Sequence, residues 1–239
     1  MRYWLIMPAA GTGRRFGATL PKQYAPLAGR TVIEWALAPF LQDARCAHAV
    51  VAVAPGDPHW PRVAGRLAAG AGGGALRVTS VTGGDARSRS VRLALAALET
   101  RAAPDDWVLV HDAARPCLAR GDLDRLVAAL SAHALGGLLA SPVRDTLKRA
   151  RDGGAAVAET LERSGLWRAL TPQMFRFRAL CAALDAAHAA ARLPGDEAQA
   201  LEWLGEQPLL VEGAASNLKI TSADDLTLAA AVLHARQRE

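Results

Sequence analysis

The chain contains 239 residues, of which 51% are hydrophobic and 21% are charged, a composition that suits one globular domain. No apolar stretch reaches the roughly 18–20 residues that a membrane-spanning helix needs, so we expect no membrane partner. The net charge of +5 would suit nucleic acid or a small polyanion, but 5% aromatic residues leave few side chains for stacking on bases. The three cysteines are isolated and lack metal-ligand spacing, which favours a reducing, cytoplasmic compartment.

Apolar, β-branched runs alternate along the chain with longer segments of helical periodicity. The predicted strands are residues 3–8, 48–55, 76–83, 106–112, 136–143 and 207–213, and the predicted helices include residues 31–42, 88–100 and 122–134. Strands that are apolar on both faces are typical of a parallel sheet with helices on both sides. We therefore expect a single α/β domain, residues 1–239, whose site lies beyond the carboxyl ends of the strands.

Residues 144–165 interrupt this alternation because they are polar and charged. Gly153-Gly154 is a turn signal, and the short β-type runs on either side of it predict a hairpin that projects from the domain. On composition alone, a solvated surface excursion without a role is an equal alternative.

Residues 8–24, PAAGTGRRFGATLPKQY, form a glycine-rich, basic segment that follows the first strand. A dinucleotide fingerprint would need a glycine where Phe16 stands, and no lysine follows a glycine as a Walker loop requires. What remains is a loop that offers bare backbone N–H groups together with Arg14, Arg15 and Lys22, and such groups suit a triphosphate. A glycine turn with solvated arginines is the plainer alternative.

Extended to residue 37, this segment resembles the nucleotidyltransferases that join a nucleotide to a phosphorylated sugar or polyol. It is most similar to the 2-C-methyl-D-erythritol 4-phosphate cytidylyltransferase family of the non-mevalonate isoprenoid pathway. Further similar stretches follow in the family's order: VTGGDARSRSVRLAL, VLVHDAARPCL, ASPVRDTLKR, LWRALTPQMFR, GDEAQALEWLG and VEGAASNLKITSADDL. The resemblance implies a Rossmann-like nucleotidyltransferase fold with a mostly parallel sheet and a protruding β-arm, residues 144–165, through which two chains form a homodimer.

The implied reaction joins CTP to methylerythritol phosphate and releases pyrophosphate. Because a phosphate anion must approach a polyanion, we expect catalysis by positioning and charge neutralisation and no general base. The resemblance assigns the catalytic cations to Arg15, Lys22 and Lys219, and it implies Mg²⁺ (or another divalent cation) bridging phosphate oxygens.

The resemblance also distributes the binding residues over several loops. Those expected to bind the nucleotide are Ala9, Ala10, Gly11, Gly13, Gly83, Gly84, Asp85, Ser90 and Ala113. Those expected to bind the second substrate are Asp112, Arg115, Thr146, Arg163, Thr171 and Asp196. Asp112 is also the candidate metal ligand, with the metal held mainly through the phosphates of CTP. Capping the turn after its strand is the plainer alternative for Asp112.

Other residues keep two interpretations. Arg14 and Arg87 suit solvent as well as substrate, and Asp196 and Glu197 suit a helix N-terminus as well as a polyol contact. No partner completes a nucleophilic triad with His111 or Cys117, so we expect both to be packing residues.

Three other functions compete with this one. A ribitol 5-phosphate cytidylyltransferase would share much of the same pattern. A non-catalytic nucleotide-binding protein would have less need of Arg15, Lys22, Asp112 and Lys219 together. Nucleic-acid binding rests on the net charge alone, and we expect none.

Overall fold

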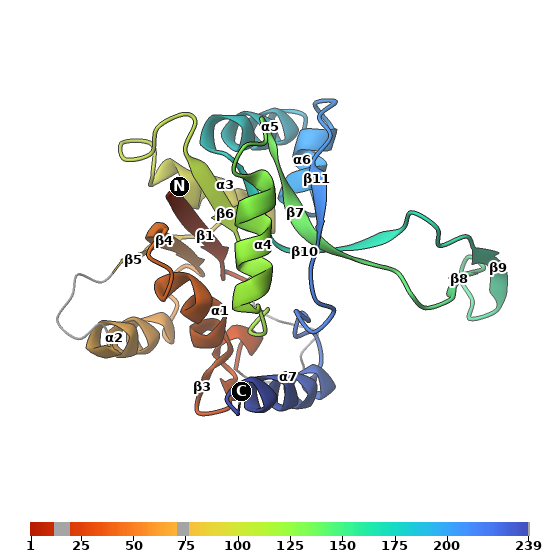
Figure 1. The fold of residues 1–239 in the computed structure, drawn as a ribbon, viewed down its shortest axis with the longest axis horizontal. Coiled ribbons are helices and arrows are strands. Elements are labelled where there is room, and N and C mark those ends of the chain that lie inside the picture. The colour runs from red at the N-terminus through yellow and green to blue at the C-terminus, as the bar shows by residue number, and fades with distance from the viewer. Residues whose placement is uncertain (12–19, 71–76, 239) are drawn as a thin grey trace.

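The computed structural model describes residues 1–11, 20–70 and 77–238, and a seven-stranded sheet forms its centre (Figure 1). The strands of this sheet lie in the order β11-β7-β10-β6-β1-β4-β5. In chain order they are β1 (Tyr3–Pro8), β4 (Cys46–Val53), β5 (Val78–Thr82), β6 (Trp107–Val110), β7 (Gly136–Pro142), β10 (Trp167–Arg176) and β11 (Leu209–Glu212). All neighbouring pairs are parallel except those of β10, which is antiparallel to β6 and β7. The mostly parallel sheet predicted from the sequence is confirmed.

Helices cover both faces of the sheet. One face packs against α1 (Val32–Leu41), α2 (Trp60–Gly70) and α4 (Arg120–Leu130), and the other against α3 (Arg87–Ala96), α5 (Phe177–Ala189) and α6 (Glu197–Glu202). Along β1, Leu5 and Met7 belong to the first core cluster while Ile6 belongs to the second, because successive side chains of a strand point to opposite faces. This alternation explains why the strands are apolar on both sides.

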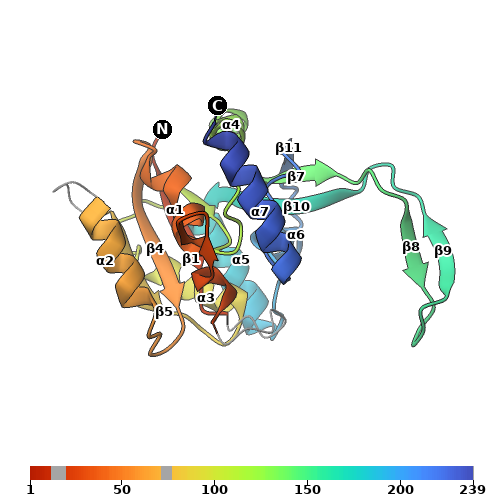
Figure 2. The ribbon, with the colours of Figure 1, turned by 90° about the horizontal axis from the view of Figure 1, so that it is seen from below.

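The antiparallel strand β10 was not among the predicted strands, and its direction follows from the arm. Strands β8 (Leu147–Ala150) and β9 (Val157–Leu161) form a separate hairpin that projects from the body in both views (Figures 1 and 2). At its base the Val143 amide donates to the Leu166 carbonyl at 2.9 Å, so the chain leaves on β7 and returns on β10. The hairpin predicted within residues 144–165 is therefore confirmed.

A third packing cluster joins the two ends of the chain. Helix α7 (Ala223–Arg236) packs against the short segment that contains η2 (Lys22–Tyr24), β2 (Pro26–Leu27) and β3 (Arg30–Thr31). Leu27 and Ile220 are both buried in this cluster, which holds the segment carrying Lys219 beside the one carrying Lys22. Within the described ranges, no helix is long and apolar enough to cross a membrane.

Candidate active site

The parallel strands β1, β4, β5 and β6 all end at the same edge of the sheet, where an α/β fold places its ligands. Backbone hydrogen bonds continue past these ends. The Ala9 amide donates to the Ala52 carbonyl at 2.7 Å, the Gly83 amide to Val53 at 2.7 Å, and the His111 amide to Ile6 at 3.0 Å. The loops that carry the predicted site residues therefore start from one rigid edge.

The two glycine loops touch at Gly83. A Cβ added there would lie 2.6 Å from the Cβ of Ala10 and 2.9 Å from the Oγ of Ser90, so only glycine fits without a shift. The Ser90 hydroxyl accepts from the Gly84 amide at 3.1 Å and donates to the Ala86 carbonyl at 3.0 Å. Ser90 thus shapes the turn between β5 and α3, and the close approach of Gly83 to Ala10 brings predicted nucleotide-binding residues of both loops together.

Asp112 follows β6 and is surrounded by cations. Its Oδ2 lies 2.8 Å from the Nζ of Lys219 and 3.5 Å from the Nε of Arg115. Its Oδ1 accepts from the Nε of Arg87 at 3.0 Å. Three segments that are distant in the sequence, the turn after β6, the start of α3 and the segment before α7, therefore meet at one carboxylate.

This environment keeps the carboxyl of Asp112 ionised. Burial alone would raise its pKa, but Arg87 and then Lys219 act in the opposite direction and hold the pKa well below its usual range. The side chain is a permanent anion, and the three cations that surround it leave the cluster with an excess of positive charge. Such a cluster suits a phosphate-bearing ligand.

The turn after β6 is held by buried hydrogen bonds. The Asp112 amide donates to the Oγ1 of Thr171 at 3.1 Å, and the Nδ2 of Asn217 donates to the Thr171 carbonyl at 2.7 Å. The Nη1 of Arg115 in turn donates to the Asn217 carbonyl at 2.7 Å. Thr171, which was predicted to bind the second substrate, is 4% exposed and takes part in these buried hydrogen bonds. The sequence analysis missed Asn217, although it lies two residues before Lys219 in the quoted motif.

Lys22 opens η2, and its neighbour Gln23 ties this turn to the end of β1. The Nε2 of Gln23, a buried residue, donates to the carbonyls of Ala9 at 2.8 Å and Gly11 at 3.1 Å. Gln23 is a second residue to which the sequence analysis gave no role, and its signal was its place in the quoted Pro-Lys-Gln. The predicted site residues Gly13 and Arg15, with Arg14, lie outside the described residues.

The remaining predicted residues occupy different surroundings. Asp85 is exposed and pairs with Arg89 at 2.7 Å, and Ala113 is buried directly after Asp112. Thr146 and Arg163 flank the two strands of the hairpin, where the guanidinium of Arg163 donates to the Arg144 carbonyl. Within one chain the hairpin points away from the strand ends, so these two residues are not gathered with Asp112 (Figure 1).

Asp196 caps α6 by accepting from the Gln199 amide at 2.9 Å, as the helix-start interpretation expects, and it also accepts from the Nε2 of Gln173 at 3.0 Å. Glu197 is fully buried and pairs with Arg87. The interpretation of Arg87 as a solvated side chain is wrong, because its guanidinium joins Glu197 to Asp112 and its side chain is 23% exposed.

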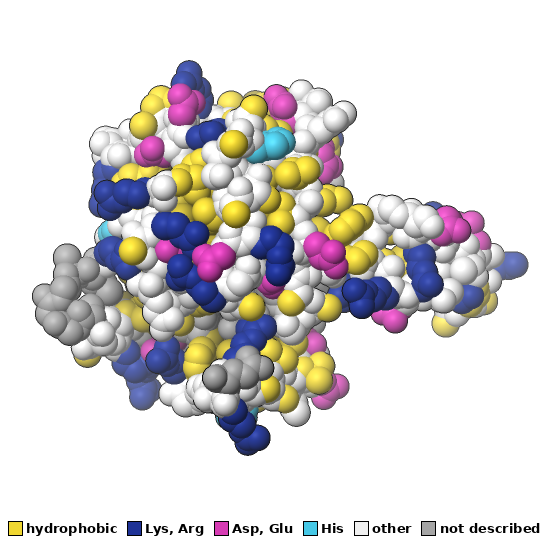
Figure 3. Space-filling view, in the orientation of Figure 1, with side chains coloured by type: hydrophobic (Ala, Val, Ile, Leu, Met, Phe, Trp, Pro, Cys, Tyr) yellow, Lys and Arg dark blue, Asp and Glu magenta, His cyan; other side chains and the backbone are white. Residues whose placement is uncertain are grey.

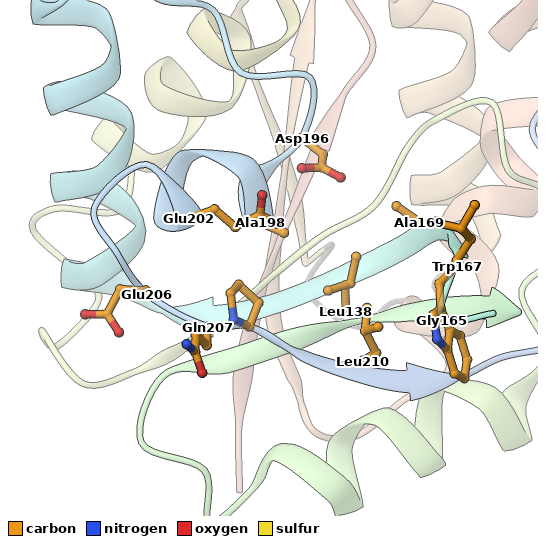
Figure 4. A pocket seen from close by; sticks show the side chains of 12 residues that line it. Leu138, Gly165, Trp167, Ala169, Asp196, Ala198, Glu202, Glu206, Gln207 and Leu210 are labelled. Atoms are coloured by element: carbon orange, nitrogen blue, oxygen red, sulfur yellow. The ribbon is translucent and has the colours of Figure 1, made fainter. Parts of the chain in front are cut away.

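A pocket of about 420 Å³ lies between α6, the base of the arm and β11. Figure 4 shows Leu138 and Leu210 on its strands, Ala198 and Glu202 on α6, and Trp167 where β10 begins. Asp196 lines the same pocket, so the carboxylate that caps α6 also faces an open space. Most of the residues that line this pocket are apolar, and α6 forms one of its walls.

His111 and Cys117 are packing residues, as expected. Burial lowers the pKa of His111 to about 4 and raises the pKa of Cys117 to about 11, so the imidazole is neutral and the thiol protonated near pH 7. His111 contacts the ring of Phe40 and the hydroxyl of Thr171. Neither side chain has the ionisation state of an activated nucleophile.

Asp112 is the candidate metal ligand among the residues that the structure describes at this edge of the sheet. Among the described residues, no three His, Cys, Asp or Glu side chains gather as an all-protein metal site would need. Mg²⁺ is commonly held by one or two carboxylates together with substrate phosphates, and here it would share the ionised Asp112 carboxylate with Arg87 and Lys219.

Comparisons with known proteins agree over nearly the whole chain. A family model described as 2-C-methyl-D-erythritol 4-phosphate cytidylyltransferase matches residues 3–235. The protein of that name from Halorhodospira halophila is 54% identical over 238 residues, which cover 99% of this chain and 96% of the relative. The protein of that name from Pseudomonas aeruginosa is 52% identical, with 94% and 93% covered.

Solved structures show the same likeness. A crystal structure of a 4-diphosphocytidyl-2C-methyl-D-erythritol synthase superposes with a TM-score of 0.82 at 39% identity, covering 97% of this chain and 98% of that one. The 2-C-methyl-D-erythritol 4-phosphate cytidylyltransferase of Thermus thermophilus superposes with a TM-score of 0.76 at 32% identity, covering 96% and 98%.

Proposed function

The chain belongs to the 2-C-methyl-D-erythritol 4-phosphate cytidylyltransferase family, and from this premise we propose that it transfers CMP from CTP to 2-C-methyl-D-erythritol 4-phosphate. The products are 4-diphosphocytidyl-2-C-methyl-D-erythritol and pyrophosphate. The observation that carries the proposal is the Asp112–Lys219 pair, at 2.8 Å, on the edge of the sheet where the two glycine loops meet.

The cations of this edge supply what the reaction needs. The phosphate of the second substrate is an anion near neutral pH, so it attacks the α-phosphorus of CTP without a general base. The negative charge on the five-coordinate phosphorus and on the departing pyrophosphate then has to be neutralised. We assign this task to Lys219 and Lys22, together with Arg15.

The nucleotide occupies the loops after β1 and β5. Glycines there let the backbone come close to the phosphates and the base, and the contact between Gly83 and Ala10 supports a single continuous binding surface. Asp112 and Arg115, held by the buried hydrogen bonds to Thr171 and Asn217, orient the second substrate.

Mg²⁺ belongs to this proposal as a cofactor. When bound, it would neutralise phosphate charge and act as a Lewis acid on phosphoryl oxygens. Asp112 is the residue that would hold it, and the phosphates of CTP would supply further ligands.

The arm completes the site from a second chain. Thr146 and Arg163 provide a hydroxyl and a guanidinium, which are apt ligands for a phosphate monoester. Because the hairpin points away from its own body, we assign both residues to the site of a two-fold partner (Figure 2). The three unpaired cysteines support a cytoplasmic location for this homodimer.

Pyrophosphate release tests the function directly. CTP, ATP, GTP and UTP are each combined with methylerythritol phosphate or ribitol 5-phosphate, with and without Mg²⁺. We expect rapid release only from CTP, methylerythritol phosphate and Mg²⁺ together. A preference for ribitol 5-phosphate would replace the assigned substrate, and tight CTP binding without turnover would identify a non-catalytic binding protein.

A further inference from the structure

Arg87 joins the carboxylates of Asp112 and Glu197, which are distant in the sequence. Its Nη1 and Nη2 donate to the two carboxylate oxygens of Glu197 at 2.7 and 3.0 Å, and its Nε donates to Oδ1 of Asp112 at 3.0 Å. The fork of the guanidinium therefore faces α6, and its remaining N–H faces the candidate active site. This two-sided geometry is available to arginine but not to lysine.

The position of Arg87 in α3 is unfavourable for a positively charged side chain. Arg87 is the first residue of α3, where the helix dipole disfavours positive charge, and the first turn of α3 contains no acidic residue. The side chain is also largely withdrawn from water, at 23% exposed, which adds a desolvation cost. Its carboxylate partners offset both costs, so the reason for this cation lies in the contacts it makes.

Glu197 has one function visible in its contacts. The residue is fully buried, and both of its carboxylate oxygens accept from Arg87. The bidentate contact fixes the plane and the rotation of the guanidinium. Because the Nε of Arg87 is rigidly joined to that plane, Glu197 also decides where the Nε points.

The hydrogen bond from Arg87 Nε in turn orients the Asp112 carboxylate. With Oδ1 held by Arg87, the other oxygen, Oδ2, faces Lys219 at 2.8 Å. We propose that Arg87 and Glu197 are positioning residues, which set the orientation of the Asp112 carboxylate toward Lys219 and the reacting groups. This inference rests on the proposed function, in which Asp112 and Lys219 belong to the catalytic machinery.

Three variants separate the parts of this arrangement. Arg87→Lys keeps the charge but removes the fork, and Glu197→Gln keeps the shape but removes the anion that holds the fork. The double variant Arg87→Gln/Glu197→Gln removes both charges of this ion pair, and Asp112 keeps Lys219 and Arg115 as partners. No buried charge is left without a partner, so the double variant should fold. Arg92→Lys is the matched control, because Arg92 lies on the same helix, is 24% exposed and pairs with Asp185 and Glu99 instead of with the site.

The measurements are kcat, the KM of each substrate and the thermal unfolding temperature. We expect the three variants to lower kcat about 10–100-fold, as for other groups that orient a functional ligand through a second hydrogen bond. The KM for CTP should change less than about threefold, because the glycine loops remain intact, and Arg92→Lys should keep its kcat within about twofold. Folded variants with the kcat of the wild type, whatever their unfolding temperature, would show that the pair is only a structural link.

A double-mutant cycle tests whether Arg87 acts through Asp112. Single-turnover pyrophosphate release at high enzyme concentration makes the slow Asp112→Asn enzyme measurable. In that background Arg87→Lys should lower the rate less than about twofold, because the carboxylate that it orients is gone. Independent, multiplicative effects would overturn the inference, whereas a wild type without activity toward CTP and methylerythritol phosphate would instead contradict the proposed function.

Discussion

At the scale of single residues, Asp112 organises the site because it is an anion among three cations. Its Oδ2 is paired with Lys219 at 2.8 Å, so in this structure the ammonium is already held at the edge of the sheet where phosphate is expected. A preorganised cation of this kind costs no reorganisation during the reaction and therefore acts mainly on the transition state.

Lys219→Ala should therefore lower kcat on the order of 10²–10³-fold, while the KM for CTP changes much less. The protein should still fold, because Arg87 and Arg115 remain beside the Asp112 carboxylate. Steady-state pyrophosphate release and thermal unfolding measure the two effects. If KM rises and kcat stays near that of the wild type, Lys219 only holds the bound nucleotide in its ground state.

Gly83→Ala tests the contact between the glycine loops. The added methyl group would lie 2.6 Å from the Cβ of Ala10, so the two loops must move apart and CTP affinity should fall about tenfold or more. Isothermal titration with CTP measures this affinity.

Gly65→Ala is the control. Nothing lies within 4 Å of its added Cβ, and alanine in the helix α2 should raise the free energy of unfolding by about 0.5–1 kcal/mol without changing the affinity for CTP. Equal CTP affinity for both variants would mean that the loops do not form one binding surface.

At the scale of elements, α1 is started and anchored by Glu34. Its carboxylate accepts from the Thr31 amide at 2.7 Å in a capping box, and it pairs with Arg66 of α2 at 2.7 Å. Burial would raise the pKa of Glu34, but Arg66 and Thr31 outweigh it and the pKa is lowered. The folded state therefore binds the proton less readily than the unfolded state does.

Glu34→Gln should destabilise the protein by about 1–2 kcal/mol near pH 7, since it weakens a cap and a charge-assisted contact. A depressed carboxyl pKa contributes stability that is present above the unfolded value of about 4.5 and is lost as the pH falls through the folded pKa. The difference between wild type and variant in urea unfolding should accordingly shrink below pH 4.5. Glu159→Gln is the control, because Glu159 forms an exposed pair with Arg149, and it should lower the free energy of unfolding by less than about 0.5 kcal/mol. If the difference in stability between wild type and Glu34→Gln did not depend on pH, the link to the pKa of Glu34 would be contradicted.

At the scale of the whole molecule, the arm carries Thr146 and Arg163 away from the body that holds Lys22. If each site takes Lys22 from one chain and Arg163 from the other, Lys22→Ala and Arg163→Ala should each be nearly inactive alone. In a mixed dimer one site collects both changes and the other collects neither. Random reassortment makes about half of the dimers mixed, so about a quarter of all sites should recover activity.

Co-expression of the two variants with different tags measures this recovery by pyrophosphate release. Purification over both tags in sequence isolates the mixed dimer, in which about half of the sites should be active. Mixed dimers with no more activity than the average of the two variants would mean that each chain builds its site alone. A protein that runs as a monomer at assay concentration would exclude the shared site altogether.

The positive charge of the whole chain should serve a small polyanion and not nucleic acid. The face in Figure 3 shows Lys and Arg side chains scattered among acidic ones, with no continuous basic stripe. With a net charge of only +5, the chain should bind duplex DNA weakly and without sequence preference at physiological salt, which fluorescence anisotropy can measure. A tight, sequence-dependent complex would overturn this interpretation of the charge.

Features that depend on neighbouring residues could be predicted from the sequence. Apolar, β-branched runs located β1, β4 and β6, and helical periodicity located α1, α3 and α4 within a few residues. Gly153-Gly154 and the short runs that flank it located the hairpin. The glycines and Asp112 could be placed at one edge of the sheet because parallel strands end together. Family motifs then supplied candidate roles that no local pattern could supply.

Contacts between distant residues follow from the three-dimensional fold. Strand β10 was not predicted because it enters the sheet as the returning leg of the arm, and that position depends on pairing with β6 and β7. Arg87 and Glu197 are 110 residues apart. When each is read alone, Arg87 suits a solvated side chain and Glu197 suits a helix start. Their contact forms where α3 and α6 cover the same face of the sheet. A buried ion pair depends on which groups surround it and on how little water reaches it, and the spacing of residues in the sequence contains neither kind of information.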